Sequence, residues 1–427
     1  MLDSIEWKGY FFLPENKEEK LPGILKFDPS EGIAVDLFGS FDSYANIPSN
    51  KKNVMLGITS EGKEITLVNC FETERGNSFP GFPSSKFSAT YLLAGYHFES
   101  YEKIFFSYVN IEYENFNAWV DISGFNKPEY DYNENKLTVV YKQPEKLHFD
   151  LNENWKGEVE FVFYRPHEFF IPSEKINIEQ TPIFKIRPAA DSHFDEFDKV
   201  MYIFNSFLAI NYYQYPILKS ITFYISDKEE FEGKLFDKSV QLYFYTGYNA
   251  GKKVRSKREL LIEYKLYANF NESIQKWYKL YNTIEKPVKV LNECLMRRGN
   301  PIETHFTSLV NALENMHESI LGKKKQSLTQ RLTSIIENLP EKVRDALLGH
   351  EVDFIDRVKN NRHYYTHYSD KYKKKAATLT ELIIISEKLK LILLVSLLKQ
   401  ISFTDEQIEK IIFSKGIYLF LHLLKVK

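Results

Sequence analysis

Residues 376–400 read AATLTELIIISEKLKLILLVSLLKQ, a long run in which apolar residues return every three or four positions. The residues with this spacing are Leu382, Ile385, Leu389, Ile392 and Val395. Such spacing places their side chains along one face of an α-helix. We therefore predict a long helix here whose apolar face packs inward against other helices.

The chain from about residue 285 onward has the same helical character. A second apolar face consists of Leu309, Leu313, Met316 and Ile320. Gly322 and Gly349 lie where helices commonly end, and the sequence from Thr404 to Gln407 has the form of a helix-capping signature. Residues 286–427 are therefore predicted to form an all-α bundle of antiparallel helices.

The first 285 residues follow a β-like pattern instead. Short runs that alternate or are rich in aromatic residues occur at 32–41, 64–71, 103–114, 136–142, 157–165, 220–226 and 240–247. Many short strands at this spacing are typical of a sandwich or a barrel, and we expect a β-rich, sandwich-like region over residues 1–285. The stretch 126–135 either separates two β units or forms a long hairpin connection. The predicted fold class is α+β.

The composition excludes several classes of protein. The chain has 427 residues, of which 43% are hydrophobic and 27% charged, so it can bury a large core and is long enough for two domains. It has only Cys70 and Cys294, too few for a disulfide scaffold or a Cys-based zinc or iron–sulfur site, and a reducing cytoplasm fits this count. No basic and apolar secretory signal opens the chain. The apolar stretches 391–398 and 416–424 are too short to cross a membrane, and we expect both to be buried helix.

Charge and motifs leave few catalytic possibilities. The formal net charge is −2, but residues 351–427 contain 14 basic and 9 acidic residues. We find no GxGxxG, GxxxxGK[ST], HExxH, CxxC or GxSxG motif. Asp237, Glu263 and Lys265 are the residue types of a carboxylate–lysine metal nuclease, yet such residues are common in a charged chain and an ordinary strand explains them better.

Arginine and histidine at close spacing suggest another chemistry. Cleavage of RNA without a metal needs a group that moves protons near neutral pH, which His provides, and a fixed cation for the phosphate, which Arg provides. Arg362 and His367 have this spacing within a segment rich in Lys, Arg and Tyr, as single-stranded RNA binding requires. The competing interpretation is a solvated helix end whose tyrosines pack on the bundle. Arg187/His193 is interrupted by Pro188, and Arg344/His350 runs into a helix cap.

The segment Asn361-Arg-His-Tyr-Tyr-Thr-His-Tyr368, followed by the long helix, resembles the Arg-polar-x3-His signature of HEPN-domain ribonucleases of the ApeA-like branch. The first half resembles the ApeA N-terminal domain, in segments 7–14, 22–29, 32–41, 65–70, 94–98 and 113–119. The resemblance implies a cytoplasmic anti-phage protein with a HEPN-type helical domain that cleaves RNA, such as tRNA or another cellular RNA, and aborts infection once a phage-derived trigger is present. It implies no cofactor and no metal.

The resemblance also assigns roles to residues. The family's Arg falls on Arg362 and its His on His367, while His363 replaces the polar residue that is most often Asn. His363 would either move protons or orient Arg362, and Glu314 would be the acid that faces the arginine. The RNA-binding residues we expect are Arg357, Lys359, Tyr364, Lys371 and Lys373.

Helix geometry adds an expectation about assembly. Five residues at about 100° each separate Arg362 and His367 by roughly 140°, so one regular helix would not direct both at one phosphate. Either the helix breaks near Tyr365 or two copies share the site, and HEPN proteins resemble the second case, which predicts a homodimer or a higher homo-oligomer. The alternative function is a non-catalytic sensor or adaptor that binds a ligand through the β region and dimerises through the helices. No membrane partner is expected.

Overall fold

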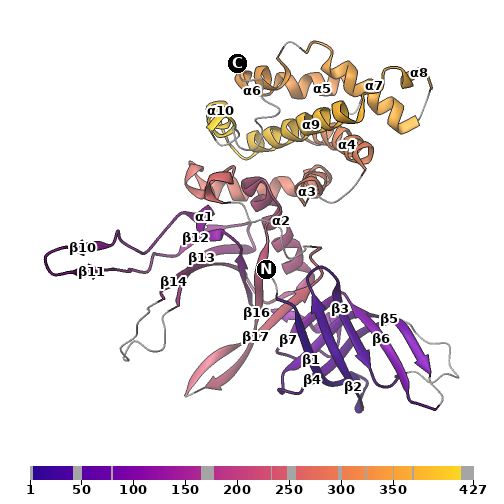
Figure 1. Cartoon of the computed structure of the whole chain (residues 1–427), viewed down its shortest axis with the longest axis vertical. Coiled ribbons are helices and arrows are strands. Elements are labelled where there is room, and N and C mark those ends of the chain that lie inside the picture. The colour runs from indigo at the N-terminus through magenta and orange to yellow at the C-terminus, as the bar shows by residue number, and fades with distance from the viewer. Residues whose placement is uncertain are drawn as a thin grey trace.

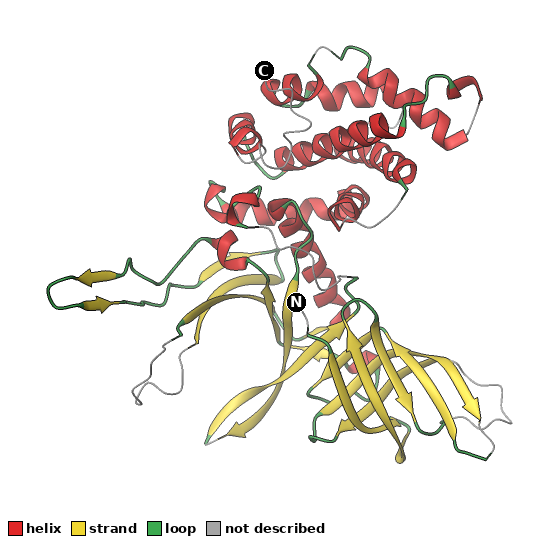
Figure 2. Cartoon of the chain, viewed as in Figure 1, coloured by secondary structure: helices red, strands yellow, loops and turns green. Residues whose placement is uncertain are grey.

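The computed structural model has a β-rich N-terminal region followed by a helical C-terminal region, which confirms the α+β class (Figure 1, Figure 2). It describes residues 3–41, 51–77, 80–164, 177–231, 233–247, 256–296, 301–322, 325–349, 351–367 and 370–414. The apolar stretch 416–424, which we expect to be buried helix, lies outside the described residues.

A six-stranded antiparallel barrel begins the fold. Its strands are β1 (Ile5–Leu13), β2 (Asn16–Asp28), β3 (Gly32–Leu37), β4 (Lys51–Thr59), β5 (Glu64–Asn77) and β6 (Pro83–Ala89). They follow the order β5-β4-β1-β2-β3-β6, and pairing of β5 with β6 closes the ring. Alternating residues such as Val35 and Phe87 fill the interior. Gly9 allows β1 and β4 to approach closely, since a Cβ there would lie 2.3 Å from the Ile58 oxygen.

Strand β7 (Tyr91–Ala94) connects the barrel to a second, curved part of the same sheet. It pairs with β5 on one side and with β17 (Lys234–Phe244) on the other. The sheet continues from β17 through β16 (Leu218–Phe231), β9 (Tyr108–Tyr113), β14 (Glu179–Pro188), β13 (Trp155–Tyr164) and β12 (Leu147–Asp150). All its pairings are antiparallel. Of the two architectures typical of such strands, the structure therefore contains a closed barrel with additional strands.

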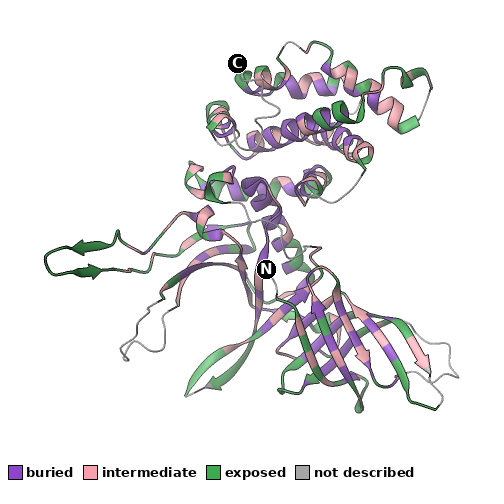
Figure 3. Ribbon diagram, viewed as in Figure 1, coloured by how far each residue is buried: buried purple, intermediate pink, exposed green. Residues whose placement is uncertain are grey.

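A hairpin projects from this region. Strands β10 (Glu129–Asp131) and β11 (Lys136–Thr138) pair only with each other, and both are exposed along their length (Figure 3). The turn-rich stretch 126–135 contains β10 and the turn of this hairpin. The remaining short elements are α1 (Phe116–Val120), β8 (Phe105–Phe106) and β15 (Ser192–His193), with three 3-10 turns at Tyr101–Lys103, Lys257–Glu259 and Tyr264–Leu266.

Helix α2 (Phe194–Tyr212) lies within the β-rich region, where the sequence pattern indicated strands. It packs on the curved sheet through aromatic rings: Phe204 stacks on Phe184 with centroids 3.7 Å apart, and Phe197 meets Trp155 edge to face. Most of its residues are buried, so an alternation of polar and apolar faces is largely missing. That burial explains why periodicity did not reveal this helix.

Helix α3 (Phe270–Met296) joins the sheet to the bundle, and it starts before the predicted helical region. Trp277 donates a hydrogen bond to the Ile203 carbonyl of α2. The backbone leaves helical geometry at Ile284, three residues before Pro287, which lacks the amide hydrogen that a regular helix needs. The kink therefore lies next to residue 285, where the sequence pattern predicted the start of the helical region.

The bundle follows as α4 (Ile302–Leu321), α5 (Leu328–Glu337), α6 (Glu341–Leu348), α7 (Phe354–His367), α8 (Asp370–Lys373), α9 (Leu379–Gln400) and α10 (Asp405–Ser414). The predicted inward faces of α4 and α9 are confirmed: Leu309 and Leu389, for example, are fully buried. Gly322 ends α4 in the left-handed conformation, and the side chain of Thr404 caps α10. One hydrophobic core runs without interruption from the curved sheet through α2 and α3 into this bundle.

Candidate active site

The candidate site lies on α7 in the helical bundle. Phe354, Val358 and Asn361 point into the protein from this helix and are buried. Their spacing leaves Arg362 and His363 partly exposed and His367 exposed at the end of the helix. The sequence thus places polar, chemically active side chains along the part of α7 that reaches solvent.

Arg362 is held by an ion pair with a neighbouring helix. Its Nη2 atom lies 2.9 Å from Oε2 of Glu314 on α4, and the two side chains are 32% and 19% exposed. A carboxylate at this distance forms a charge-assisted hydrogen bond and restricts the rotamers of a long side chain. The structure therefore brings together two of the residues that the sequence proposed, and it leaves part of the guanidinium open to solvent.

Two histidines and a tyrosine form a row of rings beside Arg362. His363 stacks on Tyr372 of α8 with centroids 5.0 Å apart, and the rings of His363 and His367 are 6.4 Å apart. Lys371 of α8 lies over the Tyr372 ring, with its Nζ 5.6 Å from the centroid. The short helix α8 thus folds back on the end of α7 and fixes the plane of His363.

The environment lowers the pKa of His363 below its ordinary value of 6.5. The causes are partial burial and then the charges of Arg362, His367, Lys359 and Lys371. Each of these charges disfavours an additional proton on the ring. His363 is therefore biased toward the neutral imidazole, a form that can accept a proton.

The expected RNA-binding residues differ in their exposure to solvent and in whether they already have a partner in the protein. Arg357 is bonded to Glu381 of α9 at 3.3 Å, whereas Lys359 is exposed on α7. Lys371 and Lys373 are exposed on α8, close in sequence to the ring of Tyr372. Tyr364 is partly buried and meets Tyr365 edge to face, with centroids 5.0 Å apart. The exposed lysines therefore provide positive charge near His363, and Arg357 has a structural partner.

Asn361 is a residue that the sequence analysis did not identify. It is 1% exposed, its Nδ2 donates to the Arg357 carbonyl, and its Oδ1 accepts from the Ala377 amide at 2.8 Å. This second bond attaches the segment before α9 to α7. A polar residue on the inward face of a helix, beside the Arg/His motif, is the signal that could have indicated this role.

Arg362 and His367 do not contact each other in the described part of a single chain. Helix α7 is continuous from Phe354 to His367, so the first of the two alternatives, a break near Tyr365, is not observed. A regular helix separates the two side chains by roughly 140° around its axis. Within one copy, His367 instead lies near His363.

Of the three metal-nuclease residues, Asp237 has different partners from Glu263 and Lys265. Asp237 bonds to Tyr108 and Lys228, while Lys265 pairs with Asp121 and Glu263. Among the described residues, no group of three or more His, Cys, Asp or Glu side chains is arranged to hold a metal ion. The carboxylate–lysine hypothesis therefore gains no geometric support.

Comparison with known families agrees with this architecture. A family model described as ApeA N-terminal domain 1 matches residues 6–277, and one described as Apea-like HEPN matches residues 293–407. The chain belongs to the ApeA family. The ApeA and HEPN domains together indicate the anti-phage, HEPN-type ribonuclease family. HEPN domains are generally associated with ribonuclease activity, and they often bind RNA and dimerise.

The first family match ends and the second begins within α3. Comparison with curated proteins and with solved structures finds no match. Within the described ranges, no helix of this ApeA protein combines the length and the apolar character needed to cross a membrane.

Proposed function

We propose that this ApeA protein is a cytoplasmic endoribonuclease that cleaves RNA through Arg362 and His367 and thereby aborts phage infection. The observation that supports this most is the ion pair of Arg362 with Glu314, which holds a partly exposed guanidinium on the helix that also carries the exposed His367. Such an arrangement suits a phosphate that approaches from solvent, because the carboxylate fixes the cation without enclosing it.

In the proposed reaction the ribose 2′-hydroxyl attacks its own phosphorus. His367 moves protons, either from the 2′-hydroxyl or to the leaving 5′-oxygen, and Arg362 stabilises the negative charge that builds on the phosphoryl oxygens. The bond from phosphorus to the 5′-oxygen breaks, so the products are a 2′,3′-cyclic phosphate and a 5′-hydroxyl. DNA lacks the attacking group and should resist cleavage.

The active unit in this proposal is a homodimer or a higher homo-oligomer. Arg362 and His367 diverge on one continuous helix, so a complete site requires α7 of a second copy. The lowered pKa of His363 favours its neutral form. His363 would assist as a proton acceptor or as a hydrogen-bond partner that orients Arg362. Exposed Lys359, Lys371 and Lys373 would bind the RNA backbone.

We propose that the two regions of the chain have different functions. Residues 286–427 would form the ribonuclease, and residues 1–285 would form a recognition and regulatory region that responds to a phage-derived trigger. The continuous core through α2 and α3 supports mechanical coupling between them. A chain that acted only as a sensor or adaptor would not need Arg362 or His367.

The test compares wild type with His367→Ala in cells challenged with phage. We expect RNA breaks that end in 2′,3′-cyclic phosphate in wild-type cells only, together with loss of phage restriction in the variant. Unchanged RNA cleavage and restriction in the His367→Ala variant would contradict the proposal. Restriction that persists without cleavage would favour the adaptor function.

A further inference from the structure

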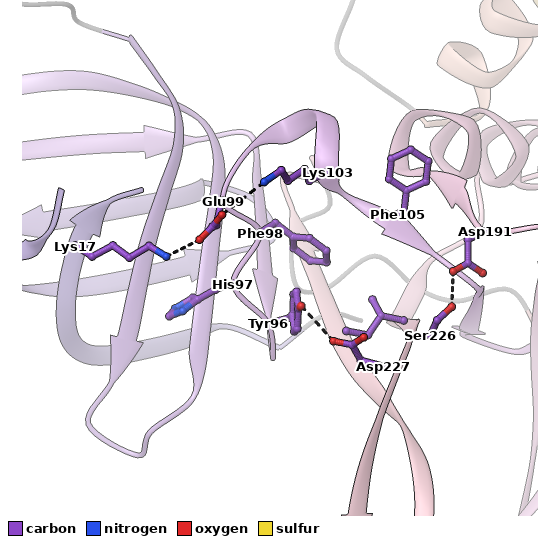
Figure 4. Close-up of a pocket in the computed structure, with 11 residues that line it drawn as sticks. Lys17, Tyr96, His97, Phe98, Glu99, Lys103, Phe105, Asp191, Ser226 and Asp227 are labelled. Atoms are coloured by element: carbon purple, nitrogen blue, oxygen red, sulfur yellow. Dashed lines mark hydrogen bonds and ion pairs between the residues drawn. The ribbon is translucent and has the colours of Figure 1, made fainter. Parts of the chain in front are cut away.

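A pocket of about 430 Å³ lies between the barrel and the curved sheet, far along the chain from α7 (Figure 4). The barrel side contributes Lys17 of β2, and the segment after β7 contributes Tyr96, Phe98 and Glu99. Phe105 of β8, Asp191 and the β16 residues Ser226 and Asp227 complete the other side. A volume of this size is in the range of small-ligand sites.

Charges are compensated at one end of this pocket. Glu99 lies 2.5 Å from the Nζ of Lys17 and 3.6 Å from that of Lys103. These pairs lower the pKa of Glu99, chiefly through the hydrogen bond from Lys17. The carboxylate of Glu99 is therefore already satisfied by the two lysines.

The other end has two carboxylates without a cation. Asp191 accepts a hydrogen bond from Ser226 Oγ, and Asp227 accepts one from Tyr96 Oη at 3.2 Å (Figure 4). Neither aspartate forms an ion pair with any residue that the structure describes. Lys238 approaches from β17, but its Nζ lies over the Tyr96 ring, 5.5 Å from the centroid. Neutral hydroxyls thus orient both carboxylates and leave their negative charge uncompensated.

Aromatic surface lies beside these carboxylates. Phe105 is 46% exposed, and it lines the pocket together with Tyr96. Its ring is supported from one side by His193, with centroids 5.4 Å apart. The face of an aromatic ring attracts a cation, and a planar guanidinium also stacks on it.

We propose that this pocket binds an alkyl-guanidinium or alkyl-ammonium group, with the cation at Asp191 and Asp227 and its alkyl stem against Phe105. The group comes either from an arginine or lysine side chain of a protein or from a free metabolite such as agmatine. Stacking on Phe105 favours the guanidinium over the ammonium. This binding activity is additional to RNA cleavage and does not depend on it.

The test is calorimetric titration of the full chain at low salt with agmatine and, separately, with the peptide acetyl-Gly-Arg-Gly-amide, each up to about 10 mM. We expect saturable binding of at least one probe by the wild type. The double variant Asp191→Asn/Asp227→Asn should bind at least about tenfold more weakly, because two charge-assisted contacts are lost.

A matched control comes from the same strand. Glu229→Gln on β16 removes one exposed carboxylate that does not line the pocket, and it should leave binding unchanged. Phe105→Leu keeps the bulk and removes the ring face, so it should weaken binding of agmatine more than that of the ammonium compound 1,4-diaminobutane. Circular dichroism and the melting temperature verify that each variant is folded.

Each outcome decides a point. Binding of agmatine alone identifies a metabolite site. Binding of the peptide alone identifies a protein-recognition site. Either result supports the proposal that the pocket binds a cationic group. The proposal is overturned if neither probe saturates. It is also overturned if the folded double variant binds as well as wild type or if Glu229→Gln weakens binding to the same extent.

Discussion

The guanidinium of Arg362 on α7 and the carboxylate of Glu314 on α4 form an ion pair, with 2.9 Å between Nη2 and Oε2. Because α4 and α7 are separated in sequence by α5 and α6, this pair exists only in the folded bundle. It connects the packing of the helices to the direction in which Arg362 points. Loss of Glu314 should therefore affect catalysis before it affects folding.

Glu314→Gln should lower RNA cleavage by about tenfold, since the side chain of Arg362 loses a fixed partner and part of its preorganisation. Arg362→Ala should lower it by roughly 10²-fold or more, because it removes the cation itself. The measurement is the rate of cleavage of a labelled RNA by purified protein once activated, together with the melting temperature. Both variants should melt close to wild type, as expected for a partly exposed pair.

Glu318→Gln is the matched control for this prediction. Glu318 lies one turn further along α4 and pairs at 3.0 Å with Arg331 of α5 rather than with a residue of α7. Cleavage by this variant should equal that of wild type. An equal loss of activity in Glu318→Gln and Glu314→Gln would mean that the effect comes from general weakening of α4.

Mixing two inactive variants tests whether two copies share the site. Arg362→Ala and His367→Ala should each be inactive, but a dimer with one copy of each retains one site with an intact Arg and an intact His. If subunits exchange freely, about a quarter of the wild-type sites are restored. The assay measures cleavage before and after joint refolding. No recovery, with mixed dimers verified by mass spectrometry, would indicate that each copy contains its own site.

The depressed pKa of His363 predicts a pH response of folding. The unfolded chain binds a proton on this ring at a higher pH than the folded chain does. The stability that neutral His363 contributes is therefore present above the ordinary value of 6.5 and lost as the pH falls through the folded value. Urea unfolding of wild type and His363→Gln between about pH 5 and 8 should show a smaller loss toward acid in the variant. Identical profiles would contradict this assignment.

Phosphate binding should reverse that shift. An anion near Arg362 and Lys359 neutralises charges that disfavour a proton on His363, so the pKa of the ring should rise when a nonhydrolysable dinucleotide binds. NMR titration of the imidazole signals, assigned with His363→Gln, measures this change. A pKa of His363 that is insensitive to the nucleotide would place the phosphate elsewhere.

Much of the bundle could be predicted from the sequence because α4 and the first half of α9 carry apolar residues at helical spacing. Leu382 and Ile385 on α9 are buried as their spacing indicates, and Thr378 caps this helix with a complete capping box. Helix α2 could not be predicted in the same way. It lies between the sheet and α3, so residues around most of its circumference are buried, including Phe197, Phe204 and Ile210. A helix buried on all sides has no periodic contrast to detect.

Only part of the candidate site could be predicted from the sequence. Local spacing identified Arg362 and His367 as a pair, because motif residues lie close in sequence. The stacking of Tyr372 on His363 and the two hydrogen bonds of Asn361 depend on how α8 and the start of α9 fold back on α7. Such contacts join separate elements, and a single sequence does not encode them in its spacing.

Asn361→Ala should destabilise the protein by about 1–3 kcal/mol, because the partly buried Ala377 amide loses its acceptor and the Arg357 carbonyl loses its second donor. Asn360→Ala, one residue earlier and less buried, should stay within about 0.5 kcal/mol of wild type. Urea unfolding measures both. Equal stabilities of the two variants would show that water replaces Asn361 without cost.

Lys390 on α9 carries a buried charge at the contact between the bundle and the end of α2. Its substitutions should therefore affect the free energy of unfolding differently from those of an exposed lysine. Its Nζ lies 2.5 Å from Glu387 and 5.4 Å from the ring centroid of Tyr213, and the lysine side chain is only 9% exposed. Burial opposes the charged ammonium, but Tyr213 and Glu387 together raise the pKa of Lys390 above 10.5. The charge therefore persists in the core at neutral pH.

Glu387→Ala should cost about 3 kcal/mol in the free energy of unfolding, because it leaves a buried ammonium without its carboxylate. Lys390→Met removes the charge while keeping the length of the chain and should cost less than about 1.5 kcal/mol. Glu285→Ala is the control: it breaks the exposed Glu–Lys pair between Glu285 and Lys289 within α3. This change should alter the free energy of unfolding by less than about 0.5 kcal/mol. Urea unfolding ranks the three variants. If Lys390→Met proves the most costly, the contact of the ammonium with Tyr213 outweighs the penalty for burying its charge, and Lys390 is then a principal link between α2 and the bundle.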